Sequence, residues 1–260
     1  DPAGATLWGL AATRVAGKPF TVTEYNHAAP NDWAAECVPM IASFAALQDW
    51  DGVFLFAYSH GSEFDKGHIA SYFDIEGNPT KMPFMPLAAR AFLGRDAAGG
   101  IAPLRDRQVV YLPRQKMLET ASLYGSGIWP LVKNVDPMLE WQGVLDRRVA
   151  VVFDESQANP FHVKLGDPRP AWTANGPGTG QYTVHDPPAF IFTGFAPAPA
   201  ADTTPQEPRL DSLQTPFASI LLVPADPTQP IDTADRLLLA AVARAENTGM
   251  VHSADRTTVG

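Results

Sequence analysis

The chain has 260 residues, 45% of them hydrophobic and 18% charged, so it is long enough to bury one large core or two medium ones. Nineteen Lys and Arg against 28 Asp and Glu give a formal charge of −9 without a basic block, which argues against nucleic acid as a partner. No apolar run is long enough to cross a membrane, residues 1–4 lack a signal-peptide pattern, and the single cysteine excludes an internal disulfide and a multi-cysteine metal site.

The first hundred residues predict a β-α-β unit. Residues 19–25 are β-branched and aromatic and are followed by turn-forming residues, which predicts a strand that ends near Glu24. Apolar residues then recur at helical spacing, which predicts a helix over 36–49 with Pro39 either kinking it or lying in its first turn. The continuous apolar run 53–58 is typical of a parallel strand that is buried on both faces.

A second helix is expected after this unit. Residues 59–79 predict an irregular loop, and the amphipathic segment 82–93 predicts a helix that ends before Gly94. A strand, a crossover helix and a second parallel strand are found in α/β barrels and in doubly wound sheets. The first predicted domain is therefore an α/β unit over 1–98.

Beyond residue 100, short apolar runs recur between Pro and Gly residues, which predicts an antiparallel β-sandwich-like domain over 99–260. The expected strands are 108–112, 149–153, 181–184, 190–192 and 217–223. Residues 195–209 predict an exposed loop, and 118–145 predict loop with a broken helix. Residues 235–247 fit either a capped helix or a strand.

Glu24 is the leading candidate for chemistry. It ends a predicted parallel strand, at the edge of the sheet where α/β barrels keep their reacting groups, and a carboxylate there can act as a nucleophile or a base. The alternative is an ion-paired or capping Glu at a strand end. Five further candidates follow the two predicted strands: Tyr25, Asn26, His27, Tyr58 and His60.

The residues that carry these candidates also show a family resemblance. The stretches 17–27 and 49–58 resemble strands 7 and 8 of the (β/α)8 TIM barrel of retaining glycoside hydrolases, in the clan that includes cellulases, mannanases and β-galactosidases. The resemblance covers 8–95, and the β-rich remainder is similar to the accessory domain of many such barrels. The chain is expected to hold the last two βα units of a barrel and a β-rich domain behind them.

The resemblance implies a hydrolase of β-linked oligo- or polysaccharides that needs no cofactor or metal and lies in an extracellular or periplasmic compartment. Glu24 matches the nucleophile, and Tyr25, Asn26, His27, Tyr58 and His60 are expected to contact or orient the sugar. The clan takes its acid/base from an Asn-Glu pair that ends strand 4, and no Asn-Glu dipeptide occurs here. We therefore expect an upstream segment or a second chain to complete the barrel.

The sequence also permits other functions. A non-catalytic carbohydrate-binding or structural module would explain the missing acid/base. The loop 60–68 has ligand types for a metal-dependent hydrolase, and an esterase would need serine and histidine but lacks a Gly-x-Ser-x-Gly elbow. Cys37 is predicted to be a packed thiol. The esterase candidates are Ser59, Ser126, His162 and His185, and the tryptophans that either stack on sugar or pack are Trp33, Trp50, Trp129, Trp141 and Trp172.

Overall fold

The structure is a computed structural model that describes residues 6–64, 66–94, 99–104, 109–124, 147–158, 169–176, 178–195, 216–255 and 257–258. Its helices are α1 (Thr6–Ala11), α2 (Cys37–Leu47), α3 (Met85–Leu93) and α4 (Arg114–Tyr124). Its strands are β1 (Thr21–Tyr25), β2 (Gly52–Leu55), β3 (Val109–Pro113), β4 (Arg148–Val152), β5 (Pro170–Gly176), β6 (Thr179–Asp186), β7 (Ala189–Phe195), β8 (Phe217–Pro224) and β9 (Leu237–Val242). Short 3-10 turns precede α2 and α3. No helix in these residues is both long and apolar enough for a bilayer crossing.

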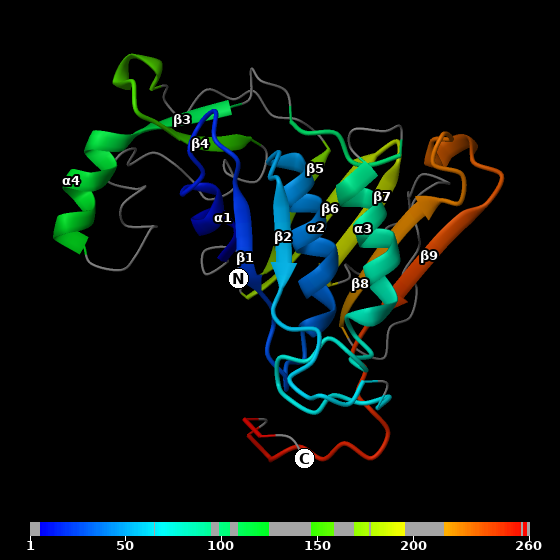
Figure 1. Cartoon of the computed structure of the whole chain (residues 1–260). Helices are drawn as coiled ribbons and strands as arrows, with labels where there is room; N and C mark the ends of the chain where they lie inside the picture. The colour runs from blue at the N-terminus through cyan, green and yellow to red at the C-terminus, as the bar shows by residue number, and fades with distance from the viewer. Residues whose placement is uncertain are drawn as a thin grey trace.

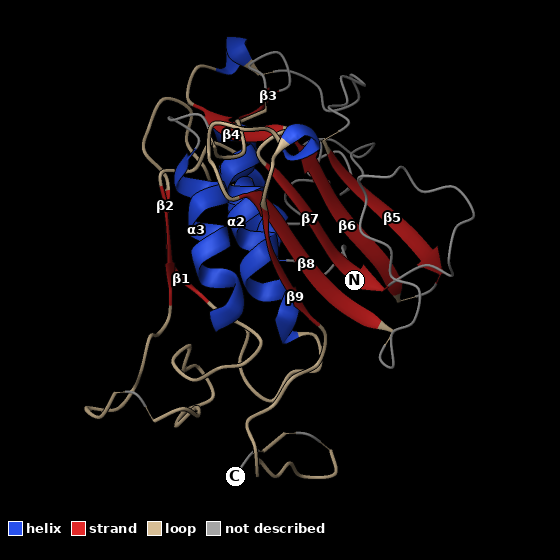
Figure 2. Cartoon of the chain, turned by 90° about the vertical axis from the view of Figure 1, so that its right-hand side faces the viewer, coloured by secondary structure: helices blue, strands red, loops and turns tan. Residues whose placement is uncertain are grey.

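The elements form three layers (Figures 1 and 2). The two-stranded sheet of β1 and β2 lies on one side of α2 and α3, and the sheet of β5 to β9 lies on the other side. Since α2 is buried along its whole length, both of its faces need apolar partners, and two sheets supply them. Helices α2 and α3 are therefore the central layer of the three.

The predicted β-α-β unit is confirmed. β1 and β2 pair in parallel, with α2 as the crossover between them. Pro39 lies in the first turn of α2, where its missing N–H costs no helical hydrogen bond, and α3 follows within the predicted range. Helix α1 was not predicted. Whether these strands belong to a TIM barrel stays a prediction, since no other strand among the described residues pairs with them.

The strands predicted beyond residue 100 are confirmed as strands. β5 to β9 form one antiparallel sheet in sequence order, and the segment 235–247 contains a strand, β9, that pairs with β8. β3 and β4 differ from the antiparallel expectation, because they pair in parallel as a separate ribbon with α4 between them. The predicted loop 195–209, apart from Phe195 at the end of β7, and residues 125–145 lie outside the described residues.

One cluster of buried apolar side chains connects the two predicted domains. Trp50 is fully buried and packs against Phe20 and Phe44, with ring centroids 5.1 and 5.6 Å apart. The same cluster of buried side chains extends through α3 to Val184, on the sheet side of the helices. The division at 98/99 stays a prediction, and the core that crosses it positions the ends of β1 and β2 rigidly.

Hydrogen bonds from Gln48 and Asp49 hold the β3–β4 ribbon at the amino ends of β1 and β2. The Gln48 side chain donates to the Arg147 carbonyl at 2.5 Å and accepts from the Val149 N–H at 2.9 Å. Arg148 donates to the Asp49 carboxylate at 2.8 Å. The opposite, carboxyl ends of β1 and β2 are left for the residues that follow Tyr25 and Leu55.

Candidate functional site

Glu24 is exposed because β1 contains a bulge. Val22 pairs with Val53 and Tyr25 with Leu55, so β1 advances three residues where β2 advances two. Strict alternation would turn Glu24 toward the helices, on the same face as buried Val22. The extra residue instead leaves both Thr23 and Glu24 exposed and Tyr25 buried. The bulge thus re-aims the carboxylate away from the helices, toward the open face of the two-stranded sheet.

The open face also carries aromatic rings from β2 and the residues after it. Phe54 and Tyr58 are 61% and 55% exposed, and Phe56 lies between them at 40%. In contrast, Val53 and Leu55 pack against the core. Large exposed apolar surface of this kind marks a binding or assembly surface rather than an ordinary solvent-facing sheet. The prediction that this sheet is buried on both faces is therefore not met within the part of the chain that the structure describes.

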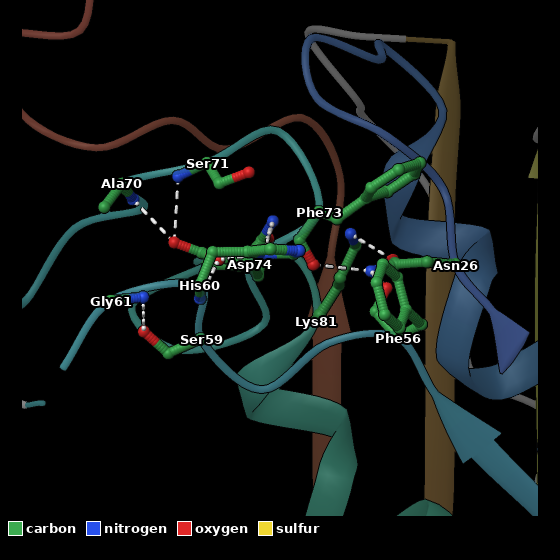
Figure 3. A network of polar contacts seen from close by, with 11 residues as sticks. Asn26, Phe56, Ser59, His60, Gly61, Ala70, Ser71, Phe73, Asp74 and Lys81 are labelled. Atoms are coloured by element: carbon green, nitrogen blue, oxygen red, sulfur yellow. Dashed lines mark hydrogen bonds and ion pairs between the residues drawn. The ribbon is translucent and has the colours of Figure 1, made fainter.

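Asn26, directly after β1, bonds to two segments that follow β2 (Figure 3). Its amide nitrogen donates to the carbonyls of Phe56 at 2.5 Å and Phe73 at 2.6 Å. Its oxygen accepts from the His27 N–H at 2.8 Å and from the Lys81 ammonium at 2.5 Å. Both amide hydrogens and both lone pairs are used, so the geometry makes Asn26 a residue that positions the strand ends.

Lys81 is the buried cation of this cluster. Its side chain is fully buried, and Nζ donates to Asn26 Oδ1 and to the His27 carbonyl at 2.6 Å. Burial lowers the pKa of Lys81, while the nearby Cys37 and Asp74 act in the opposite direction. The cation therefore stays buried because the loop after β1 supplies oxygen acceptors for it.

Replacing Lys81 by Met is expected to lower the free energy of unfolding by about 2–3 kcal/mol. Met keeps most of the side-chain volume but leaves the His27 carbonyl without its charged donor. Chemical denaturation measures the change, with Lys18→Met as the control, because Lys18 is exposed and should stay within about 0.5 kcal/mol of wild type. A loss below about 1 kcal/mol for Lys81→Met would show that the cation does not hold the loop.

Buried Tyr25 and partly buried His27 and Glu36 form a second cluster next to Lys81. The Tyr25 hydroxyl lies 3.1 Å from His27 Nε2, and His27 Nδ1 lies 3.7 Å from a Glu36 oxygen. Burial, and then the Lys81 charge, lowers the pKa of His27 to about 4, while burial raises the pKa of Glu36 to about 6. Burial also raises the pKa of the Tyr25 phenol. At pH 7 the imidazole is neutral and most of Glu36 is ionised.

These opposite shifts predict a pH-dependent effect of Glu36→Gln on stability. The unfolded chain protonates His27 near pH 6.5 but the folded chain only near 4, so this stability is lost as the pH falls from 6.5 to 4. Glu36 acts in the opposite direction, because the folded chain takes up its proton near pH 6 and the unfolded chain near 4.5. In wild type, the stability gained by protonating Glu36 partly offsets the stability lost at His27 as the pH falls, and Glu36→Gln removes this gain. The variant should become about 2 kcal/mol less stable relative to wild type between pH 7 and pH 4.

Chemical denaturation of wild type and Glu36→Gln between pH 7 and pH 4 measures the difference in their free energies of unfolding. The contributions of the other carboxylates are the same in both proteins and cancel in this difference. A difference that is constant with pH, or that shrinks on acidification, would contradict the assigned pKa values.

His60 is held by Asp74 in the loop after β2 (Figure 3). Asp74 Oδ1 accepts from the His60 N–H at 2.9 Å and lies 2.8 Å from His60 Nδ1. Its other oxygen accepts from the N–H groups of Ala70 and Ser71 at 2.9 and 2.8 Å. Burial by itself would raise the pKa of Asp74, but these hydrogen bonds outweigh it and lower the pKa. The carboxylate thus folds the loop onto itself and fixes the imidazole, whose ring is also edge-on to Phe56.

The structure brings the sequence candidates to one end of the β1–β2 sheet but separates them into two groups. Glu24 and Tyr58 are exposed, and His60 is partly exposed with 37% of its side chain accessible. Tyr25 is buried, and Asn26 and His27 are partly buried and bonded within the protein. No hydrogen bond or ion pair to the Glu24 side chain is found among the described residues.

Sequence reasoning missed three members of the polar clusters: Glu36, Asp74 and Lys81. Asp74 is the one charged residue within the otherwise apolar segment 72–75, and this charge was the available signal for it. Lys81 follows the polar residues Asn78 and Thr80, so its sequence context gave no comparable signal. Their partners lie in distant segments, which no local pattern reveals.

The residues of the alternative hypotheses have other contacts. In the loop 60–68, His60 turns to Asp74 and His68 Nδ1 donates to the Lys66 carbonyl, and the described residues contain no cluster of three or more potential metal ligands. Ser59 accepts from the Gly61 N–H, while Ser126 and His162 lie outside the described residues. His185 lies on β6.

Cys37 and the tryptophans mainly pack. The prediction of a packed thiol is confirmed, since Cys37 is fully buried and burial raises its pKa to about 11. Trp50 lies in the core, and Trp33 packs between Phe195 and Phe217 at 5.1 Å from each ring. Trp172 is partly buried against the same core, and Trp129 and Trp141 lie outside the described residues.

Comparisons of the chain with protein-family models, with curated protein sequences and with solved structures find no match. The functional interpretation therefore depends on the chemistry of the site.

Proposed function

We propose that this chain carries the nucleophile of a retaining glycoside hydrolase that acts on β-linked glycans. The observation that supports this most directly is the bulge in β1, which exposes Glu24 at the carboxyl end of a parallel strand. Bulges next to active sites commonly re-aim a side chain, and a carboxylate held on a rigid strand is an effective nucleophile. The resemblance of 17–27 and 49–58 to strands 7 and 8 of the clan points to the same residue.

In the proposed reaction, a Glu24 oxygen attacks the anomeric carbon and the bond from that carbon to the leaving oxygen breaks. The leaving oxygen takes a proton from a second carboxylic acid, which then removes a proton from the water that hydrolyses the glycosyl-enzyme. The exposed Tyr58 ring is placed to stack on a sugar, and His60 is oriented by Asp74 for a hydrogen bond. Tyr25, Asn26 and His27 act by holding the strand end.

The partner in this proposal is an upstream segment or a second chain that supplies further barrel strands and the acid/base. The exposed rings of Phe54 and Phe56 and the unpaired edges of the β1–β2 sheet, as described, support such a partner. A retaining enzyme needs its two carboxyl groups about 5–5.5 Å apart, so the second acid must lie over the same open face. The five-stranded sheet on the far side of α2 and α3 corresponds to the accessory β-domain.

Covalent trapping tests the proposal. A 2-deoxy-2-fluoroglycoside with a dinitrophenolate leaving group needs no acid, so the trapping step depends on the nucleophile alone. Wild-type protein should gain the mass of one fluoroglycosyl group, on the peptide that contains Glu24, and Glu24→Gln should gain none. An adduct on another carboxylate, or no adduct with fluoroglucosyl, fluoromannosyl and fluorogalactosyl reagents in the assembled enzyme, would remove Glu24 from this role.

A non-catalytic carbohydrate-binding module is the second candidate. The specific observation in its favour is a set of exposed rings at this end of the molecule, since Tyr58, Phe64 and Tyr72 are each more than half exposed. Such rings stack on sugars without a carboxylate. Retention on insoluble cellulose or mannan that is unchanged by Glu24→Gln, together with no covalent adduct, would favour this function.

A further inference from the structure

A groove of about 1040 Å³ lies at the carboxyl ends of β1 and β2. Three segments form its walls: 28–30 after β1, 68–72 after β2, and the C-terminal residues 247–250 with 257–258. Figure 1 shows the loops after both strands and the C-terminal segment together, below the arrowhead of β2. The groove therefore lies at the same end of the α/β unit as Glu24.

Hydrogen bonds join the walls of this groove. The Ala29 N–H donates to the Tyr72 carbonyl at 2.7 Å, which connects the loop after β1 to the loop after β2. Asn247 reaches the second loop from the C-terminal segment, accepting from the Ile69 N–H at 3.2 Å and donating to the Gly77 carbonyl at 2.8 Å. Asp74 fixes 70–71 from inside. Since these contacts cross up to about 180 residues of sequence, the groove is formed by the tertiary fold before any ligand arrives.

The outer wall is also folded. The Ser253 hydroxyl accepts from the N–H groups of Thr257 and Thr258 at 3.1 and 3.0 Å, and the Ser253 N–H donates to the Thr258 carbonyl at 3.1 Å. These contacts bring Thr257 and Thr258 back against Ser253. The C-terminal segment is thus built as a wall rather than left as an extended tail.

The lining indicates a neutral, hydroxyl-rich ligand. None of the described lining residues is Asp, Glu, Lys or Arg, and the imidazole of His68 in the lining bonds through Nδ1 to the Lys66 carbonyl. Tyr72 is 56% exposed and offers a ring for stacking. The side-chain hydroxyls along the groove belong to Ser71, Tyr72, Thr248, Thr257 and Thr258.

We infer that this groove binds a neutral β-glycan chain beyond the bond that Glu24 attacks, with the C-terminal segment as its outer wall. The volume is slightly above the range of roughly 300–1,000 Å³ for small-molecule sites, which suits several linked sugars better than one. The inference rests on the proposed function for the position of the cleaved bond. The binding itself needs no contribution from Glu24.

Binding of cellohexaose and β-1,4-mannohexaose to this chain, measured by titration calorimetry, tests the inference, because every residue that lines the groove belongs to the chain itself. Tyr72→Ala should weaken binding of the better hexaose about tenfold, because it removes the ring and keeps the backbone bond to Ala29. Thr248→Trp should abolish binding, because the larger indole side chain would occupy the groove. Thr248 is exposed, so the substitution should not disturb the core. Phe153→Ala is the matched control and should leave binding unchanged, since Phe153 is 65% exposed and directly follows β4, away from the groove.

The outcomes separate the groove from the nucleophile. Tyr72-dependent binding that persists in Glu24→Gln supports the groove, even if covalent trapping fails and the proposed hydrolase is abandoned. Equal binding by wild type, Tyr72→Ala and Thr248→Trp overturns the groove, even if Glu24 is trapped. Absence of binding of both hexaoses to wild type overturns it as well, and tighter binding of hexagalacturonic acid than of either neutral hexaose overturns the assignment of a neutral ligand.

Discussion

Replacing Glu24 by Gln in the assembled enzyme is expected to lower kcat by roughly 10⁵-fold. The amide has nearly the same shape as the carboxylate, but it cannot form the glycosyl-enzyme, so the loss falls on the chemical step. Because Glu24 is exposed and no hydrogen bond to its side chain is found among the described residues, the substitution should leave the free energy of unfolding unchanged. Steady-state hydrolysis of aryl β-glycosides, with denaturation curves of the same preparations, measures both quantities.

Glu63→Gln is the matched control for this substitution. Glu63 is an exposed carboxylate in the loop after β2, and its replacement should leave kcat close to wild type. Glu24→Ala with added azide gives a second readout, because azide can occupy the space of the lost carboxylate and attack the anomeric carbon. The expected product is a glycosyl azide of inverted anomeric configuration. Glu24→Gln that retains a tenth of wild-type kcat would end the assignment of Glu24 as nucleophile.

Replacing Asp74 by Asn is expected to cost about 3–5 kcal/mol of stability in the loop after β2. Asp74 is 2% exposed and accepts from four donors, two on each oxygen. An amide has only one oxygen, so in either orientation its NH₂ group faces backbone N–H donors. The loop should open and release His60, which also lowers activity. Chemical denaturation and protease cleavage within 61–72 measure the effect.

The pH dependence of this variant provides an independent check. Hydrogen bonds lower the pKa of Asp74 in the folded chain, so its contribution to stability is present above the unfolded value of about 3.9 and is lost as the pH falls through the folded pKa. The difference between wild type and Asp74→Asn should therefore shrink at the lowest pH. Asp232→Asn, at an exposed position, is the control and should be nearly neutral. A cost below about 1 kcal/mol at pH 7 for Asp74→Asn would contradict the proposed role of the carboxylate.

The sequence by itself determined the elements that local patterns encode. The β-branched run 19–25, the helical spacing of 36–49 and the apolar run 53–58 predicted β1, α2 and β2, because periodicity and turn residues act within a few residues of the chain. The same holds for α3 and for β3, β4, β6, β7 and β8, whereas β5 (Pro170–Gly176) was not predicted. The position of Glu24 at a strand end also follows from local sequence.

Only the tertiary structure decided where the side chains at the strand ends point. The bulge at Thr23 and Glu24 arises from the pairing of β1 with β2, and a period-two pattern does not contain it. Pairing with β8 likewise makes 237–242 a strand, although its residues also suit a helix. The parallel pairing of β3 and β4 depends on contacts with α1 and Gln48, far away in the sequence.

The polar clusters and the groove were also decided by tertiary structure. Lys81 finds its acceptors more than 50 residues away, and Asn247 closes the groove wall from about 180 residues away. Local sequence cannot encode such partners, because a buried charge or amide is stable only when the whole fold brings hydrogen-bonding groups to it. The physical reason is the sequence distance over which each effect acts. Propensity and periodicity depend on residues a few positions apart, whereas burial and hydrogen-bond satisfaction depend on contacts between segments that are distant in the sequence.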